Sequence, residues 1–525
     1  MSEQSQHPGH TSPQQPSTQS DPAQPVENTA DGFGQSRLLA DRRAKLVQLR
    51  DSLHVDPFGG REPGIMSIED ARSRFVEGAE GDARPVVKIA GRVMLHRDNG
   101  KLQWILLRDD RGEVQIACSK KDLSEQDFQI ASLADLGDIL VAHGPIMKTR
   151  TGEITVWATG VKMGAKSLAL PPDKFHGLED EELRYRRRYV DMYVRPEVMH
   201  IFRTRSRIVS EVRRFMEERG FLEVETPMLQ TQAGGAAARP FVTHMNALDI
   251  DLYMRIAPEL YLKRLLVGGM PRVFEINRNF RNEGVDRSHN PEFTMMEAYE
   301  AFGDYTTMME LTESLIRRLA QMVNPSSVIE WNGHAIDYAK PFRKATYREL
   351  FQEANGFDLL DSARVRAKAR EMGFVKEATL DDWLVVNHVF EDTVEDSLIQ
   401  PTFIMDYPSA ISPLTRPRKD DPRFAERWDI YIGGIEVGPC YTELNDPDIQ
   451  EAKFREQLKG ADAEEQTFRT LDEDFLHALR VGMPPAGGLG LGIDRITMLL
   501  TGSRSLRDVI MFPFMRPQEA TSHRP

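Results

Sequence analysis

The stretch between residues 272 and 299 constrains the fold of this chain more than any other. Polar and apolar residues alternate at both of its ends, and the middle contains Gly284, Asp286 and Ser288. Because successive side chains of a strand point to opposite faces, this alternation predicts two strands joined by a polar loop. The fold must therefore accommodate a hairpin with one polar side.

The polar side of this hairpin has an unusual composition. An alternating strand most often has one solvated face, and that is the simplest interpretation here. A guanidinium, however, offers a planar fork to a phosphate, and an aromatic ring offers a flat surface to a base. If the two polar faces align, they form a site, made of Glu275, Asn277, Asn279, Arg281 and Glu283 from the first strand and Phe293, Met295, Glu297 and Tyr299 from the second.

A second hairpin is predicted in residues 427–446, where two apolar runs flank Gly433-Gly434. This turn would place Tyr431 opposite Glu436 and Asp429 diagonally on the same side. Two carboxylates so placed suit Mg²⁺, although a pair of exposed acids is also common on hairpins.

Pro439 lies in the second strand of this hairpin and has no N–H to donate, so a bulge is expected there. The bulge would turn Tyr441 and Glu443 inward beside Glu436. Farther on, residues 487–500 (GGLGLGIDRITMLL) predict a glycine-rich strand that leads into a helix with Asp494 and Arg495 in its first turn. The sequence contains no P-loop pattern and no dinucleotide-binding fingerprint.

Residues 85–163 predict an all-β region of three strands, a helical interval and two further strands. This order is typical of a five-stranded OB-fold barrel, whose exposed sheet face commonly binds oligonucleotides. Trp104, Gln115 and Glu153 could stack on and read an unpaired base, but a lone tryptophan in a small barrel is more often part of the core.

Composition sets the remaining bounds. Two cysteines exclude a disulfide framework, and the net charge of −14 argues only weakly against a nucleic-acid partner. No membrane span or secretion signal is visible, so we expect a cytoplasmic protein.

We expect the following organisation: a disordered polar tail (1–35), a helical segment (36–84), the barrel (85–168), a basic linker (169–195), a catalytic domain (196–517) with a helical insertion at about 322–398, and a tail (518–525).

Three motifs carry a family resemblance. FRNEG followed by HNPEFTMMEAY closely resembles the second signature motif of the class II aminoacyl-tRNA synthetases, in its bacterial lysyl version. The helix before GFLEVETPML resembles the first motif, and GLGLGIDR resembles the third. The resemblance implies an α+β fold with an OB-fold barrel and a six-stranded antiparallel sheet flanked by helices. It also implies a homodimer that uses ATP, Mg²⁺ and L-lysine to charge tRNA(Lys).

Residue by residue, the resemblance implies the following roles. Arg281, Glu283 and Arg495 are catalytic, and ATP is bound by Arg281, Glu283, His289, Phe293 and Arg495. Asp429 and Glu436 hold Mg²⁺, and Trp104, Gln115 and Glu153 contact the anticodon. Lysine is bound by Gly235, Glu259, Glu297, Tyr299, Tyr441 and Glu443.

Substrate choice follows from charge, because the carboxylates of Glu297 and Glu443 and the nearby tyrosines suit an ammonium group, whereas an aspartate pocket would need basic residues. Four positions depart from the family pattern: Trp104 replaces the usual Phe, Asp429 a Glu, Pro439 an Asn and Cys440 a small residue.

Two other functions compete with this interpretation. A ligase that attaches lysine to a protein resembles only the catalytic half and lacks the barrel, which this chain has. A non-catalytic RNA-binding or regulatory relative typically lacks the motif arginines, whereas Arg281 and Arg495 are both present.

Overall fold

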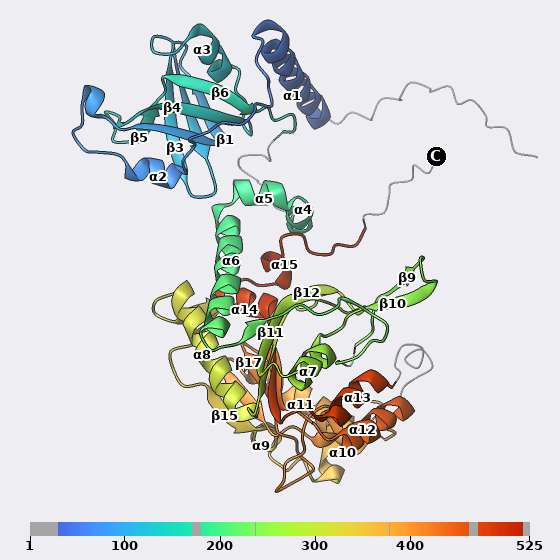
Figure 1. Ribbon diagram of the computed structural model, residues 1–525. Helices are drawn as coiled ribbons and strands as arrows, with labels where there is room; N and C mark the ends of the chain where they lie inside the picture. Colours follow the sequence, from blue (N-terminus) through green and yellow to red (C-terminus); the bar gives the residue numbers. More distant parts are fainter. Residues whose placement is uncertain (1–29, 171–179, 237, 377, 461–470, 518–525) are drawn as a thin grey trace, which may run out of the picture. The chain divides into compact units, whose positions relative to one another are not determined.

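The computed structural model describes residues 30–170, 180–236, 238–376, 378–460 and 471–517. The chain divides into two compact units, residues 1–174 and 175–525, and each is described by itself (Figure 1). Most of the expected polar tail and all of the C-terminal tail lie outside the described residues. Residues 30–35 were also expected in the disordered tail, and that expectation is wrong, because helix α1 (Ala30–Val47) already includes them.

The first unit is a closed barrel of six strands in the order β1-β2-β3-β5-β4-β6, and β1 also pairs with β4. The predicted count of five is wrong, because the last expected strand is divided into β5 and β6 at Ala158-Thr159. The strands are β1 (Val86–Asp98), β2 (Leu102–Arg108), β3 (Glu113–Ser119), β4 (Ile139–Lys148), β5 (Ile154–Trp157) and β6 (Gly160–Ala165). The predicted helical interval is α3 (Glu125–Ser132), and η1 (Gln48–Ser52), α2 (Ile68–Ser73) and η2 (Gly81–Ala83) precede the barrel.

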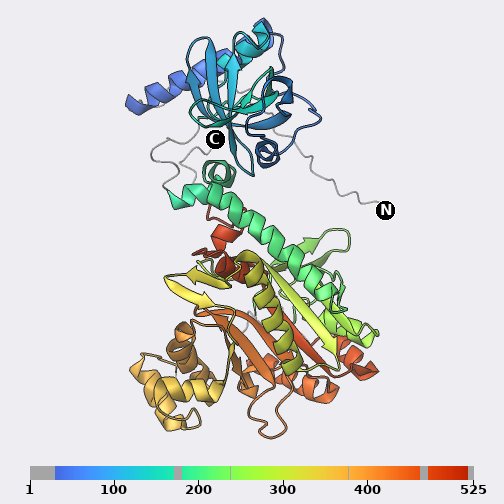
Figure 2. The same ribbon diagram turned by 90° about the vertical axis from the view of Figure 1, so that its left-hand side faces the viewer.

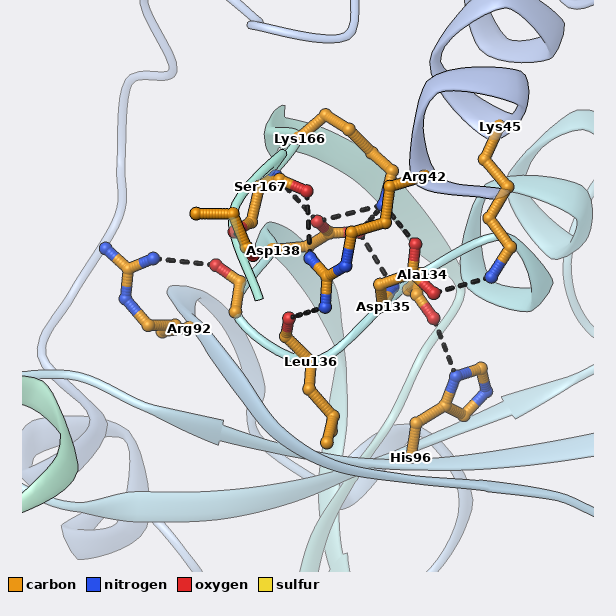
Figure 3. A network of polar contacts seen from close by, with 12 residues as sticks. Arg42, Lys45, Arg92, His96, Ala134, Asp135, Leu136, Asp138, Lys166 and Ser167 are labelled. Atoms are coloured by element: carbon orange, nitrogen blue, oxygen red, sulfur yellow. Dashed lines mark hydrogen bonds and ion pairs between the residues drawn. The ribbon is translucent and has the colours of Figure 1, made fainter. Parts of the chain in front are cut away.

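Helix α1 is fastened to the barrel by a polar network (Figure 3). Arg42 donates to the carbonyl oxygens of Leu136 (2.7 Å) and Ser167 (2.9 Å). The buried ammonium of Lys166 lies 2.6 Å from Asp135 and 2.8 Å from Asp138. A buried charge is tolerated when it is paired in this way, so the network fixes one helix against the barrel.

The second unit is built on an eight-stranded sheet in the order β15-β16-β17-β18-β19-β12-β11-β7. Its six middle strands are antiparallel, as predicted, and β15 and β7 add a parallel strand at each edge. The strands are β7 (Leu222–Glu223), β11 (Arg272–Phe280), β12 (Glu292–Ala301), β15 (Arg343–Thr346), β16 (Thr402–Met405), β17 (Arg427–Ile432), β18 (Ile435–Thr442) and β19 (Ala486–Gly492). Two small sheets lie outside it: β8 (Leu229–Gln230), β9 (Val242–Met245) and β10 (Ile250–Met254), and β13 (Val328–Trp331) with β14 (His334–Asp337).

Helices cover one face of this sheet. The long helices α6 (Pro196–Glu217) and α8 (Tyr305–Val323) lie side by side over it (Figure 2), and α14 (Ile493–Leu500) packs against both. Even-numbered residues of β11 and β12, such as Phe274, Met296 and Ala298, enter this core. The odd-numbered residues therefore face the other side, as the alternation predicted. Apart from the helices of residues 347–394, the second unit also contains α4 (Glu181–Arg186), α5 (Arg188–Val194), α7 (Glu259–Val267), α12 (Pro447–Gly460), α13 (Glu473–Gly482) and α15 (Leu506–Val509), with the short turns η3 (Glu395–Ser397) and η4 (Ser409–Ile411).

The expected helical insertion is only partly helical. It contains α9 (Tyr347–Asn355), α10 (Ser362–Glu371) and α11 (Asp382–Val394), which share a second core with strand β16. The strands β13, β14 and β15 precede these helices, and β15 extends the main sheet. The segment is therefore part of the sheet architecture. None of the helices in the described ranges has an apolar stretch long enough to span a bilayer.

Candidate active site

A cavity of about 390 Å³ opens on the face of the main sheet opposite α6 and α8, next to α7, which packs on part of that face. It is lined by strands β12, β18 and β19, the loop after β11 and the starts of α7 and α14. The predicted site residues that line it are Gly235, Glu259, Arg281, Glu283, His289, Phe293, Glu297, Tyr299, Glu436, Tyr441 and Arg495. Residues from four separate parts of the sequence thus meet in one place.

One half of the cavity is basic and aromatic. The Arg281 guanidinium lies over the Phe293 ring, 5.1 Å from its centroid. Arg495, in the first turn of α14, donates to the backbone oxygen of Glu436 (2.6 Å). A half-buried ring with one guanidinium over it and a second guanidinium in the same cavity can hold a base and its phosphates by stacking and charge.

The loop between β11 and β12 carries Glu283 and His289 at the rim of this half, where both are exposed. His289 Nδ1 lies 2.9 Å from Asp286 Oδ2. Partial burial acts in the opposite direction, but hydrogen bonds from His289 and Ser288 lower the pKa of Asp286 to about 2. The histidine is therefore oriented by an ionised carboxylate.

The other half of the cavity is acidic. Burial, together with the nearby charge of Glu259, raises the pKa of Glu297 to about 8. The Tyr299 hydroxyl donates to Glu297 Oε2 (3.1 Å). Gly235, with φ of +86°, passes so close to Glu259 that an added Cβ would lie 3.1 Å from the Glu259 Cβ. Two carboxylates and a tyrosine hydroxyl that face a small cavity can bind an ammonium group.

Glu443 does not line the cavity but lies buried behind it. There it contacts the ammonium of Lys263, which is also 2.6 Å from Glu259 Oε1. Burial opposes the charge on Lys263, but the carboxylates of Glu259 and Glu443 outweigh burial and raise the pKa of Lys263 above its ordinary value. Sequence reasoning missed Lys263, although its four-residue spacing from Glu259 on a helix was a usable signal.

The bulge in β18 lies at Val437, and the expected position at Pro439 is wrong. Ile430 pairs with Gly438 and Tyr431 with Glu436, so Val437 is the extra residue, and pairing through Pro439 is regular. Proline has no N–H to donate, and Pro439 pairs only with β17, because the pairing of β18 with β19 begins at the next residue, Cys440. The bulge still resets the alternation, so that Glu436 and Tyr441 both line the cavity while Cys440 is buried in the core.

Asp429 does not line the cavity either. Both of its oxygens accept hydrogen bonds from Arg427, at 2.8 Å from Nε and 2.6 Å from Nη2. The Arg427 guanidinium also lies 4.2 Å from the centroid of the Tyr407 ring and borders the cavity. Sequence reasoning missed Arg427, whose two-residue spacing from Asp429 places both on one face of β17.

The barrel carries the three predicted anticodon residues. Strand register places Trp104, Gln115 and Trp157 on one face. Trp104 is half-buried and meets Trp157 edge to face at 6.2 Å, and Gln115 donates to Thr155 Oγ1 (3.1 Å). Glu153 is exposed at the start of β5. Trp104 is thus a surface residue of the sheet, outside the barrel core.

Comparison with known proteins adds to this geometry. The family model for class II tRNA synthetases (D, K and N) matches residues 180–516, and the model for an OB-fold nucleic acid binding domain matches residues 87–163. The chain belongs to the class II tRNA synthetases.

Relatives of this synthetase match along most of their length. The lysine–tRNA ligase of Pelotomaculum thermopropionicum is 48% identical over 489 residues, which cover 92% of this chain and 96% of the relative. Those of Carboxydothermus hydrogenoformans (45% identical, covering 92% and 99%) and Pectobacterium carotovorum (46% identical, covering 92% and 96%) are similar.

The acids of this synthetase fit Mg²⁺ only in part. Glu436 lines the cavity and its carboxylate is 40% exposed, as a ligand shared with substrate phosphates requires. Asp429 has both oxygens engaged by Arg427. In the described part of the chain, no group of three or more His, Cys, Asp or Glu side chains could by itself hold a metal ion.

Proposed function

We propose that this synthetase is a lysine–tRNA ligase. In the first step a carboxylate oxygen of L-lysine attacks the α-phosphorus of ATP. The new P–O bond gives lysyl-adenylate as the bond to the β-phosphate breaks and pyrophosphate leaves. In the second step a ribose hydroxyl of the 3′-terminal adenosine of tRNA(Lys) attacks the lysyl carbonyl, and AMP leaves. The observation that carries this proposal is a single cavity with a basic, aromatic half and a buried acidic half.

The basic half would bind ATP. Arg281 holds the α-phosphate and neutralises charge as the attack proceeds, and Phe293 stacks under the adenine. Arg495 covers the base from the other side and reaches the γ-phosphate, while Glu283 and His289 hold the adenine and pyrophosphate groups. Catalysis by Arg281, Glu283 and Arg495 is then positioning plus charge stabilisation, with no protein nucleophile.

The acidic half would bind lysine. Glu259 and the backbone at Gly235 hold the α-ammonium, and Glu297, Tyr299 and Tyr441 recognise the side chain. Glu443, which lies behind the cavity, adds its charge without lining the pocket. A pocket whose buried carboxylates need a cation rejects neutral analogues strongly, because these leave the charge without a partner.

Mg²⁺ would neutralise the phosphates of ATP when it is bound. The chemistry of the cavity makes Glu436 the ligand from this chain. Asp429 can join it only after Arg427 releases one carboxylate oxygen, and in the arrangement described here it orients Arg427 instead.

The other partners belong to the same proposal. The barrel face with Trp104, Gln115 and Glu153 would bind the anticodon of tRNA(Lys). A groove of about 1190 Å³ beside α6, in which Phe512 is 68% exposed and Phe514 52% exposed, favours a homodimer, because apolar surface of this kind is usually covered by a partner. We place the enzyme in the cytoplasm, where aminoacyl-tRNA is used.

The test is ATP–pyrophosphate exchange with each of the standard amino acids in the absence of tRNA. Exchange with lysine alone establishes both activation and specificity, and charging of tRNA(Lys) completes the assignment. Exchange with another amino acid would overturn the reading of the pocket around Glu297. Exchange with none would favour a regulatory, non-catalytic protein.

A further inference from the structure

Lys263 is a fully buried cation directly behind the acidic half of the cavity. Its side chain has no exposed surface, and its ammonium bridges Glu259 on its own helix and Glu443 from the segment after β18. The bridge thus joins two elements that are far apart in sequence, and one of its two acids lines the cavity.

Glu443 reaches this position only because β19 leaves room for it. A Cβ added to Gly488 would lie 1.8 Å from Glu443 Oε1 and 2.6 Å from the Tyr299 ring. The titratable groups around the bridge are the carboxylates of Glu259, Glu443 and Glu297, the hydroxyls of Tyr299 and Tyr441 and the buried thiol of Cys440. The guanidinium groups of Arg281 and Arg255 also act on Glu297 and favour its ionised form.

The charges of this cluster are unequal. Three buried carboxylates, those of Glu259, Glu297 and Glu443, surround a single ammonium. When all are ionised, two negative charges remain unbalanced inside the protein. Unbalanced buried charge is costly, so the cluster is incomplete without a cationic ligand.

We propose that Lys263 is a positioning residue for amino-acid specificity, which holds the carboxylates of Glu259 and Glu443 in place and leaves the cluster with one ammonium for three carboxylates. L-Lysine has two ammonium groups, and its carboxylate has Arg281 as a partner. The inference rests on the proposed function and deepens it. Amino acids with a neutral side chain bring one ammonium group and leave the second charge unbalanced.

The pKa values in the cluster support this division of roles. The raised pKa of Lys263 keeps it charged throughout the physiological range, whereas burial raises the pKa of both Glu297 and Glu443 to about 8. Lys263 acts against burial at Glu443, so its removal would raise the pKa of Glu443 further.

The experiment uses Lys263→Met in the full-length enzyme, with tRNA-free ATP–pyrophosphate exchange as the assay. We expect KM for lysine to rise about tenfold, the effect of losing one coupled contact, while KM for ATP stays within about twofold. Above about pH 8, where KM for lysine of the wild type levels off, KM of the variant should keep a steep pH slope, because the pKa of Glu443 rises further when its counter-ion is removed. A purely structural role for Lys263 would not change that slope.

The barrel offers a matched control. Lys166 is equally buried and also bridges two carboxylates, Asp135 and Asp138, but it belongs to the other unit (Figure 3). Lys166→Met should lower the melting temperature and leave KM for lysine unchanged. This control separates the general cost of removing a buried lysine from a specific effect on the pocket.

The double variant Lys263→Met/Glu443→Gln removes both buried charges, so it keeps the test possible if the single variant does not fold. We expect its KM for lysine to be close to that of Glu443→Gln alone. The inference would be overturned if Lys263→Met left KM for lysine and its pH slope unchanged. It would also be overturned if the effects of the two substitutions on KM for lysine were strictly additive in the double variant. A wild-type enzyme that gives no exchange with lysine would instead overturn the proposed function.

Discussion

At the scale of single residues, Glu297 stands out because burial makes its ionised form unfavourable until a cation arrives. Its pKa of about 8 lies far above the ordinary value for a glutamate. The free enzyme therefore holds a proton on Glu297 at neutral pH, and lysine binds the minority of molecules that have lost it.

This predicts a pH dependence of lysine binding. Since only the ionised form of Glu297 accepts the ammonium group, KM for lysine should fall about 25-fold from about pH 6.5 to pH 8.5 as the ionised fraction grows. Glu297→Gln should bind lysine more weakly and lose this slope. A wild-type KM that rises over the same range would contradict the assignment.

The Glu297 carboxylate should also affect the stability of the fold. Lysine binding improves as the pH rises, whereas the free energy of unfolding should fall. An acid whose pKa is higher in the folded than in the unfolded state favours folding least at high pH, so stability declines as pH rises from about 4.5 to 8. Without lysine, Glu297→Gln should therefore raise the melting temperature at about pH 8.5 and change it little near pH 5. Thermal denaturation at the two pH values measures both.

Arg281 and Arg495 allow a sharper test of the nucleotide half. Alanine at either position should reduce adenylate formation by about a hundredfold or more, the usual cost of removing a group that stabilises developing charge. Binding of tRNA should change little. Arg343→Ala serves as the control, because Arg343 is an exposed residue paired with Glu353 on the sheet edge. Exchange activity that survives both cavity variants would exclude the proposed mechanism.

At the scale of elements, β19 shows how the glycines of a strand can shape a site. Its glycines let Glu443 and Tyr299 lie directly against the backbone. We expect Gly488→Ala to displace Glu443 and to raise KM for lysine more than KM for ATP. Gly490→Ala on the same strand should have a smaller effect, because its Cβ would meet only the flexible end of Met295 at 3.2 Å. Equal effects of the two substitutions would argue against a specific role of Gly488.

The sequence predicted most of the elements that build the site, and the misses have physical causes. Alternation in β11 and β12, the double-glycine turn after β17 and the helix after β19 were all predicted correctly, because each is a local pattern. The bulge at Val437 was misplaced because proline signals a missing donor but does not fix where a ladder gains a residue. The extra strands β7 and β15 pair in parallel with distant segments, which no local pattern reveals.

The partners within the site were the hardest to predict. The sequence indicated no role for Lys263, and Arg427 was predicted only as the start of a strand. The role of Lys263 depends on the Glu443 carboxylate, which another element brings into contact. The role of Arg427 depends on the Asp429 carboxylate, which lies on the same face of β17. The sequence therefore indicated which residues meet ligands and did not indicate which ones hold those residues in place.

At the scale of the whole molecule, the two units divide the proposed reaction. Every residue that lines the candidate active site belongs to the second unit, whereas the predicted anticodon face belongs to the first. We expect Trp104→Ala to leave lysine-dependent exchange unchanged and to weaken charging of tRNA(Lys) by about tenfold or more, as the loss of one stacked base predicts. Trp157→Ala, which removes the ring that meets Trp104 edge to face, shows how much of the loss in charging comes from disturbing this pair of rings. An equal loss of exchange and charging in Trp104→Ala would contradict this division.

Strand β12 contributes to the core on one face and to the cavity on the other, and this double use limits how its length can change. A single inserted residue before Met296 would exchange the two sets of side chains, turning Glu297 toward α6 and α8 and Met296 toward the ligand. Folding and activity would then fail together. Insertions within either strand should accordingly prevent folding, whereas insertions in the loop between β11 and β12 should preserve the fold and reduce only the use of ATP, because the loop carries Glu283 and His289. A scan of single-residue insertions across residues 272–301, followed by melting temperature, would show two intolerant strands on either side of a tolerant loop.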